Sequence, residues 1–303
     1  MHYLTAYPDV AAARDRFVID LRGARSAHDP WQLQDLAIED EPDERGGRSR
    51  VGTVFLTGRE CPWRCAMCDL WRYTTRDDTP PGAVPAQIEA ARRAWASGGE
   101  SVAKIKLYNA SNFFDPRAVP ENDYAAIGAL VHDVEQVIVE SHPSLIGDRV
   151  DRFLRALDGP RLEVAMGLET AHPAALDALN KRMTIADFTR AAEALRHRNV
   201  SLRVFLLISP PFIPDSDQDE WLLKSVEFAE ACGASVISLI PARAGNGAME
   251  ALTAQKLFRP PTQEDVDRSL KLVLARAPSR EPRASSLESR APRILLDPWA
   301  HAG

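Results

Sequence analysis

The chain has 303 residues, 45% of them hydrophobic and 26% charged, which is ordinary for a soluble globular protein. Its formal net charge of −6 excludes a positive field over the whole protein that would attract nucleic acid. Nucleic acid could then bind only at a local basic patch. No apolar run approaches the roughly 20 residues that cross a bilayer, and the N-terminus lacks the apolar core of a signal peptide. We therefore expect a cytoplasmic protein with no membrane partner, in which cysteines stay reduced.

The first 50 residues are expected to be an N-terminal extension. Its stretch Glu39–Arg50 is rich in charge and turn residues and is interpreted as a solvated connection. From residue 51 onward, short β-branched apolar runs alternate with helical patterns. Six buried strands are predicted, over Val51–Gly58, Ala103–Ser111, Gln136–Ser141, Arg161–Glu169, Ser201–Ser209 and Ala234–Pro241.

Helices are predicted between the strands, where apolar residues recur at helical spacing. One of them follows Thr184 and Asp187, which resemble a capping box. The stripes are Val150, Phe153, Leu154 and Leu157; Phe188, Ala191, Ala192 and Leu195; and Leu222, Val226 and Ala229, with further helices expected over Pro85–Ser97 and Gln263–Leu274.

Strands that alternate with helices imply right-handed βαβ units and a parallel sheet in an α/β fold. Six units are fewer than the eight of a closed barrel, so a partial (β/α)6 TIM-type barrel and a doubly wound open sheet both fit residues 51–262. Residues 263–303 form a C-terminal extension, with a helix, a flexible Pro-, Ser- and Arg-rich segment over Arg276–Arg293, and a possible edge strand over Ile294–Trp299.

Three of the four cysteines stand within eight residues, at Cys61, Cys65 and Cys68, directly after the first predicted strand. In parallel α/β folds this position is a loop at the functional edge of the sheet. A structural zinc site would need a fourth cysteine or a histidine, and Cys232, the remaining cysteine, is interpreted as a plain buried thiol on a helix. A [4Fe-4S] cluster can use three cysteines and leave one iron open for a small molecule.

The Cys61-x3-Cys65-x2-Cys68 motif in this context resembles the signature of the radical S-adenosylmethionine (radical SAM) superfamily. The segments Tyr108–Pro116, Val139–Ser144 and Gly167–Pro173, with Leu179–Thr184 and Ile208–Phe212, resemble the branch that holds the archaeosine-synthase radical SAM subunit and the elongator type. The resemblance implies that the open iron binds S-adenosyl-L-methionine. It further implies that one electron cleaves this cofactor to a 5′-deoxyadenosyl radical, which abstracts hydrogen from the substrate.

The resemblance also implies the residues that contact S-adenosyl-L-methionine. Each has a simpler alternative: a strand-end turn for Asn109 and Ser111, a helix N-terminal charge for Glu169 and a surface position for Lys181. Met67 replaces an aromatic residue that is usual beside the adenine, and its thioether can pack on a ring edge. The cofactor-binding residues are thus Met67, Asn109, Ser111, Glu169 and Lys181.

Four polar residues at other strand ends are predicted to bind substrate: Glu140, His142, Arg243 and Asn246. An imidazole at His142 can relay a proton, although a lone histidine is more often structural. Arg243 suits an anionic group, and the loop around it equally suits a non-functional turn. Trp63 and Trp71 are expected to shield the cluster from water or to form a binding surface.

The sequence therefore predicts a radical SAM enzyme acting on a small molecule or a nucleoside. A tRNA substrate is possible, and an electron donor such as flavodoxin or ferredoxin is implied. The alternative from another class is a zinc-stabilised binding protein without catalytic activity.

Overall fold

A single sheet of eight strands forms the centre of the computed structural model, which describes residues 6–109, 111–276 and 291–297. The strands lie side by side in chain order. β1 runs antiparallel to β2, and all later neighbours are parallel. The strands are β1 (Asp35–Pro42), β2 (Arg48–Leu56), β3 (Lys104–Asn109), β4 (Gln136–Glu140), β5 (Arg161–Glu169), β6 (Ser201–Ile208), β7 (Ala234–Pro241) and β8 (Arg293–Leu296).

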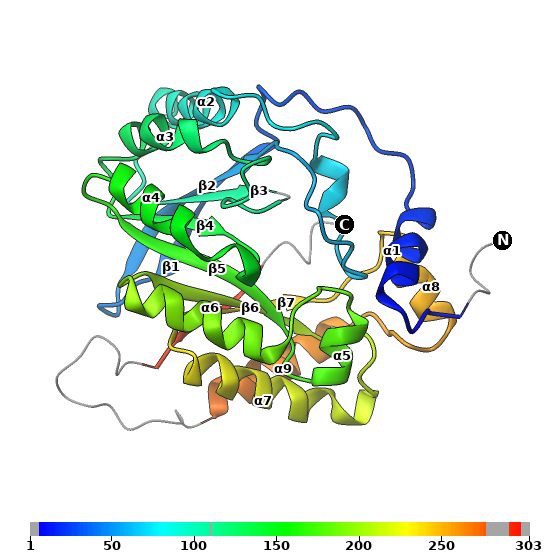
Figure 1. Ribbon diagram of the computed structural model, residues 1–303. Coiled ribbons are helices and arrows are strands. Elements are labelled where there is room, and N and C mark those ends of the chain that lie inside the picture. Colours follow the sequence, from blue (N-terminus) through cyan, green and yellow to red (C-terminus); the bar gives the residue numbers. More distant parts are fainter. Residues whose placement is uncertain (1–5, 110, 277–290, 298–303) are drawn as a thin grey trace.

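The six strands β2 to β7 confirm the predicted βα alternation and the partial barrel. Their uninterrupted order is not that of a doubly wound sheet, in which the strand order reverses part-way along the sheet. Figure 1 shows the sheet curling, with helices on its outer face. The helices are α1 (Ala11–Asp20), α2 (Ala83–Ser97), α3 (Tyr124–Leu130), α4 (Asp148–Ala156), α5 (Pro173–Ala178), α6 (Ile185–His197), α7 (Gln218–Ala231), α8 (Ala248–Ala254) and α9 (Gln263–Ala275).

Local signals fixed several element boundaries correctly. Thr184 accepts a hydrogen bond from the backbone N–H of Asp187, and the Asp187 side chain accepts from Thr184, which completes the capping box of α6. β8 pairs in parallel with β7 and confirms the expected edge strand. The flexible segment expected over Arg276–Arg293 lies mostly outside the described residues.

The prediction for Glu39–Arg50 was right for the solvated turn at Asp43–Gly47 and wrong for the residues on both sides of it. These residues are the end of β1 and the start of β2. Its charged residues resembled a surface segment, but Glu39 and Glu41 point toward basic side chains on other strands. The two carboxylates pair with Lys106 and Arg203, which are too distant in the sequence for a local pattern to indicate them.

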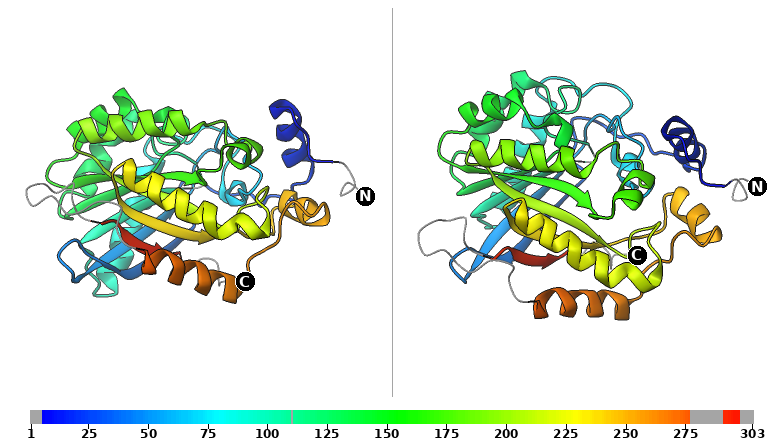
Figure 2. Two further views of the ribbon diagram at one scale, coloured as in Figure 1. Left: turned by 90° about the horizontal axis from the view of Figure 1, so that it is seen from below. Right: turned by 60° about the horizontal axis from the view of Figure 1, so that its bottom comes forward.

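Two apolar clusters flank the sheet. The larger one lies between the strands and the outer helices and contains alternate strand residues such as Val54, Leu107 and Val164. The smaller one joins α1 to α8, with Phe17 and Val18 packed near Met249 and Leu252. Figure 2 shows these two helices beside each other at one end of the barrel. No helix in the described ranges is both long and apolar enough to cross a lipid bilayer.

A network of buried ions occupies the inside of the barrel. Arg203 on β6 donates to both carboxylate oxygens of Glu41 on β1, at 3.0 and 2.9 Å, and to Glu163 on β5 at 2.6 Å. Lys106 on β3 pairs with Glu41 at 2.6 Å. Burial alone would raise the pKa of Glu41, but the hydrogen bond and charge of Arg203 lower it to about 2. Because β1 and β6 are far apart in the sheet, this contact holds the sheet in its curled form.

Replacement of the central guanidinium should destabilise the barrel strongly. In Arg203→Leu, two buried carboxylates lose their main partner, so we expect the free energy of unfolding to fall by about 3–5 kcal/mol. Urea unfolding measures this change. Arg93→Leu is the control, because Arg93 pairs with Glu89 on an exposed helix face and should change stability by less than about 1 kcal/mol. Equal effects of the two substitutions would contradict the structural role of the buried network.

Candidate functional site

The three clustered cysteines lie on a loop between β2 and α2, here called the cysteine loop (residues 58–75). Its two ends are joined, because Thr75 N–H donates to Gly58 O at 2.9 Å and Glu60 N–H donates to Thr75 O at 3.0 Å. The loop leaves the sheet at the carboxyl end of β2. The predicted position at the carboxyl ends of the parallel strands is thus confirmed.

The thiols of Cys61, Cys65 and Cys68 lie close enough to influence one another's ionisation. Burial raises the pKa of all three, that of Cys68 to about 12, and for Cys65 and Cys68 the charge of the neighbouring sulfurs adds to this effect. Lys181 acts in the opposite direction on Cys65. In the part of the chain that the structure describes, no three His, Cys, Asp or Glu side chains form a site for one metal ion. The three thiols therefore do not form a single-ion site.

Two asparagines hold the backbone of the cysteine loop. Asn246 donates to Ala66 O at 2.7 Å and to Cys68 O at 3.3 Å, while its own oxygen accepts from the N–H of Met249 at 2.8 Å. Asn180, on the turn before α6, donates to Arg64 O at 2.8 Å. The positive φ of 59° at Asn180 is one that asparagine tolerates better than most residues. These hydrogen bonds satisfy backbone carbonyl groups of the cysteine loop, which has no helix or strand to pair them.

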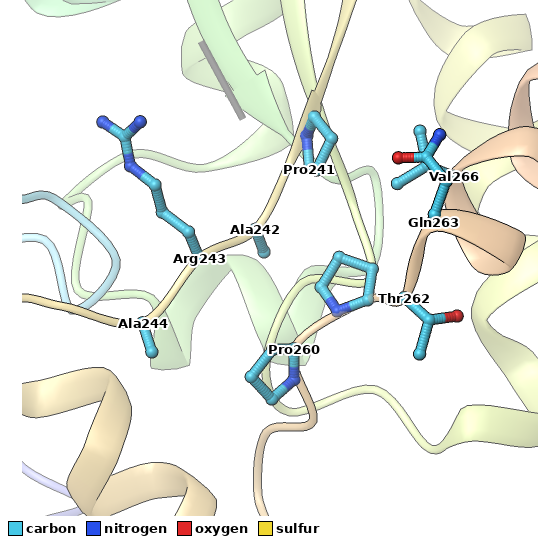
Figure 3. Close-up of a pocket in the computed structure, with 9 residues that line it drawn as sticks. Pro241, Ala242, Arg243, Ala244, Pro260, Thr262, Gln263 and Val266 are labelled. Carbon is cyan, nitrogen blue, oxygen red and sulfur yellow. The ribbon is translucent and has the colours of Figure 1, made fainter. Parts of the chain in front are cut away.

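Arg243 also contacts the cysteine loop. Its guanidinium pairs with Asp69, next to Cys68, at 3.0 Å. A small pocket of about 170 Å³ lies beside Arg243, between the end of β7 and the start of α9. Figure 3 shows that the Arg243 side chain points away from Pro260 and Thr262, which line this pocket. The structure thus brings Arg243 and Asn246, both predicted to bind substrate, into contact with the loop that carries the cysteines.

A buried ion pair lies beside the thiols. Lys181 Nζ donates to Glu169 Oε1 at 2.5 Å, and both side chains are at most one-tenth exposed. Burial lowers the pKa of Lys181, but the Glu169 carboxylate outweighs this and raises it. Lys181 is therefore not the surface lysine considered as an alternative. A Cβ at Gly167 would stand 2.2 Å from Glu169 Oε1 and 2.4 Å from Lys181 Nζ, so the pair occupies space that only glycine leaves open.

The His142 side chain contacts this ion pair's segment and the cysteine loop. Its Nδ1 contacts Ser144 Oγ at 2.8 Å, its Nε2 contacts Lys181 O at 3.0 Å, and its ring stacks on Trp63 at 3.9 Å. Its backbone N–H donates to Asn112 Oδ1, and Asn112 Nδ2 donates to Cys61 Sγ at 3.3 Å. Burial and the charge of Lys181 lower the pKa of His142 to about 4. Both ring nitrogens are occupied, as in a structural histidine.

Comparison with known proteins shows what the chain is similar to. No family model matches the chain. The chain is 29% identical over 226 residues to archaeosine synthase subunit beta of Methanosarcina acetivorans, which covers 71% of this chain and 64% of that protein. It is also 29% identical over 170 residues to archaeosine synthase subunit beta of Thermococcus kodakarensis, covering 54% and 52%. The chain thus spans about half to two thirds of the length of these curated relatives.

Solved structures with a similar fold include two proteins that match most of this chain. Elp3 of Methanocaldococcus infernus has a TM-score of 0.52 at 13% identity, over 70% of this chain and 55% of that chain. Coproporphyrinogen III oxidase of Escherichia coli, described as a radical SAM enzyme, has a TM-score of 0.52 at 15% identity, over 74% and 51%.

The resemblance to the radical SAM superfamily is confirmed.

The structure places the remaining predicted residues at separate positions. Met67 packs against the small apolar cluster of α1 and α8. Ser111 has a buried hydroxyl without a hydrogen-bond partner among the described residues. Asn109 ends β3, but its side chain and all of Ala110 lie outside the described residues. Glu140 ends β4 and is partly exposed.

Sequence reasoning missed the contribution of the N-terminal segment and of Asn112. Arg22 and Arg25 pair with Glu60 of the cysteine loop, Arg22 at 2.7 Å. The same two guanidinium groups lie over the ring of Trp71, which is only 2% exposed. The only signal in the sequence was a basic pair in the first 50 residues and an acid next to Cys61. Nothing local indicated that they meet.

The depressed pKa of His142 predicts a pH dependence of stability. Folding favours the neutral ring, so the free energy of unfolding should fall as the pH drops from 6.5 toward about 4, by at most about 3 kcal/mol. Urea unfolding at several pH values measures this slope. His142→Gln should flatten it, whereas His132→Gln, at an exposed position, should keep the slope of the unsubstituted protein. An unchanged slope in His142→Gln would contradict the assignment.

Proposed function

We propose that Cys61, Cys65 and Cys68 ligate a [4Fe-4S] cluster with one open iron that binds S-adenosyl-L-methionine. The protein then acts as a radical SAM enzyme on a small-molecule or nucleoside substrate. The observation that supports this most directly is that three half-buried cysteines share one loop at the carboxyl end of β2. Such a donor set fits a cluster, in which each thiolate binds a different iron. Cys232, at the end of α7, takes no part in it.

The chain prepares this site through its own contacts. When bound, the cluster and S-adenosyl-L-methionine supply one-electron chemistry that no side chain can perform. Asn112 donates to the sulfur of Cys61, and Lys181 favours the thiolate of Cys65. Asn180 and Asn246 fix the backbone that carries the sulfurs.

Glu169, Lys181 and Ser111 are proposed to bind S-adenosyl-L-methionine, together with Asn109 and Met67. Glu169 suits the ribose hydroxyls and Lys181 suits the carboxylate. The Glu169–Lys181 pair lies beside Cys65, since both charges act on its pKa. The unpartnered hydroxyl of Ser111 offers one more hydrogen-bonding group at the end of β3.

The names of the relatives favour a nucleoside in tRNA as substrate, because two of them are called archaeosine synthase subunit beta. The net charge of −6 favours a small molecule, since binding to RNA gains most from basic surfaces. Both substrates need an external electron donor, for which flavodoxin or ferredoxin is proposed.

Removal of one ligand should abolish the cluster. After anaerobic reconstitution, we expect about four irons per chain and dithionite-dependent release of 5′-deoxyadenosine. Cys65→Ala should lose both, and Cys232→Ala should keep both because its thiol packs against the barrel core. Iron analysis and product chromatography measure the outcome. Stoichiometric zinc without cleavage would instead support the zinc-stabilised binding protein.

A carboxylate substitution should separate cofactor binding from cluster binding. In Glu169→Gln the amide still accepts from Lys181 but loses its charge, so we expect S-adenosyl-L-methionine to bind at least about tenfold more weakly. The iron content should be unchanged. Equilibrium dialysis with labelled cofactor measures the affinity, and an unaltered affinity would rule out a role of the Glu169 charge.

A further inference from the structure

The N-terminal segment (residues 6–31) contacts both segments that hold the backbone of the cysteine loop. Asn180 donates to Asp15 Oδ1 at 2.8 Å through the same amide nitrogen that donates to the loop. On the other side, a Cβ at Gly247, just before α8, would stand 1.9 Å from Leu21 O. The end of α1 therefore passes this turn at a distance that only glycine allows.

Two arginines of the N-terminal segment contact the cysteine loop itself. Arg22 pairs with Glu60 Oε1 at 2.7 Å, and Arg25 pairs with Glu60 Oε2. Both guanidinium groups also lie over the ring of Trp71, with Cζ 4.8 Å and 5.7 Å from the ring centroid. Glu60 and Trp71 stand on either side of the three cysteines in the sequence, so the two arginines hold the loop at both ends of the cysteine motif.

These arginines carry more positive charge than their partner balances. Arg64 also pairs with Glu60, at 3.3 Å, so three guanidinium groups share one carboxylate and pair with no other in the part of the chain that the structure describes. The side chains of Arg22 and Arg25 are only 11% and 12% exposed. Arg22 Nε and Arg25 Nη1 are buried without a hydrogen-bond partner among the described residues. Buried positive charge of this kind is costly unless an anion lies nearby.

Other acidic side chains beside the cysteines have basic partners of their own. Asp69 pairs with Arg243, and Glu169 pairs with Lys181. The positive surplus on Glu60 therefore remains next to the cysteine motif. Thiolate ligands give a bound cluster a net negative charge, which grows when the cluster takes up an electron. The surplus is of the sign that such a cluster attracts.

We propose that Arg22 and Arg25 are positioning residues of the cluster site, which hold the cysteine loop through Glu60 and Trp71 and favour the reduced cluster by their charge. This inference rests on the proposed function, because it concerns the same cluster. The N-terminal segment is then a working part of the site, although it lies outside the barrel and carries none of the cysteines.

The reduction potential of the reconstituted full chain, followed by electron paramagnetic resonance, tests the effect of charge. In the double variant Arg22→Gln with Arg25→Gln, the potential should shift to more negative values, because the reduced cluster loses nearby positive charge. The double variant Arg22→Lys with Arg25→Lys should keep the potential, as should Arg16→Gln, the matched control at an exposed position of α1. An unchanged potential in the glutamine variant would overturn the proposal.

Alkylation by iodoacetamide, a neutral reagent, tests the positioning of the loop in the full chain before reconstitution. With Cys232→Ala as background, the glutamine variant should react at least about tenfold faster than the chain that keeps both arginines, because the loop opens locally. Loss of positive charge alone would slow the reaction, since it disfavours the thiolate, so a faster rate reports movement of the loop.

The lysine variant and Arg16→Gln should keep the slow alkylation rate. An equal or slower rate in the glutamine variant would overturn the proposal. If the unsubstituted chain binds no iron, the proposed function fails, and the alkylation rates still decide whether Arg22 and Arg25 position the cysteine loop.

Discussion

Arg203 is the side chain on which the architecture depends most. It lies inside the barrel and joins Glu41 of the first strand to Glu163 of the fifth, so that a sheet with two free edges is held as a curl. The curl makes the carboxyl ends of the parallel strands converge. The segments after β5 and β7 then meet the cysteine loop after β2, from which their contacting asparagines are more than a hundred residues away in the chain. A buried guanidinium is costly to desolvate, and three hydrogen bonds to two carboxylates offset that cost.

The cysteine loop has little regular structure and owes its shape to its neighbours. Asn180, Asn246 and Arg243 reach it from two other segments, and Arg22 and Arg25 reach it from the N-terminal segment. Three half-buried thiols are thereby held on one loop, and desolvation raises the pKa of each. Metal binding removes the thiol protons outright, so this burial is compatible with ligation and excludes water from the site.

Residues expected to touch substrate illustrate the limit of reasoning from strand ends. Glu140, His142, Arg243 and Asn246 all follow or end strands, so the sequence could not rank them. In the structure, His142 has both ring nitrogens occupied, and Arg243 and Asn246 contact the cysteine loop. Glu140, at the end of β4, stays partly exposed. The difference depends on which way each strand end points, which is a property of the register and curl of the sheet.

The sequence by itself determined the strands and helices of the barrel and the three cysteines proposed as cluster ligands. Apolar periodicity placed the six strands, the Thr184–Asp187 pair placed the start of α6, and the spacing of three cysteines indicated cluster chemistry, because each of these is a local pattern. Tertiary structure alone decided that the Glu41 side chain is buried inside the barrel, that Asn112 donates to Cys61 and that the N-terminal arginines cover Trp71. In each case the energy comes from a charge or hydrogen-bond partner distant in sequence. No local pattern encodes such a partner.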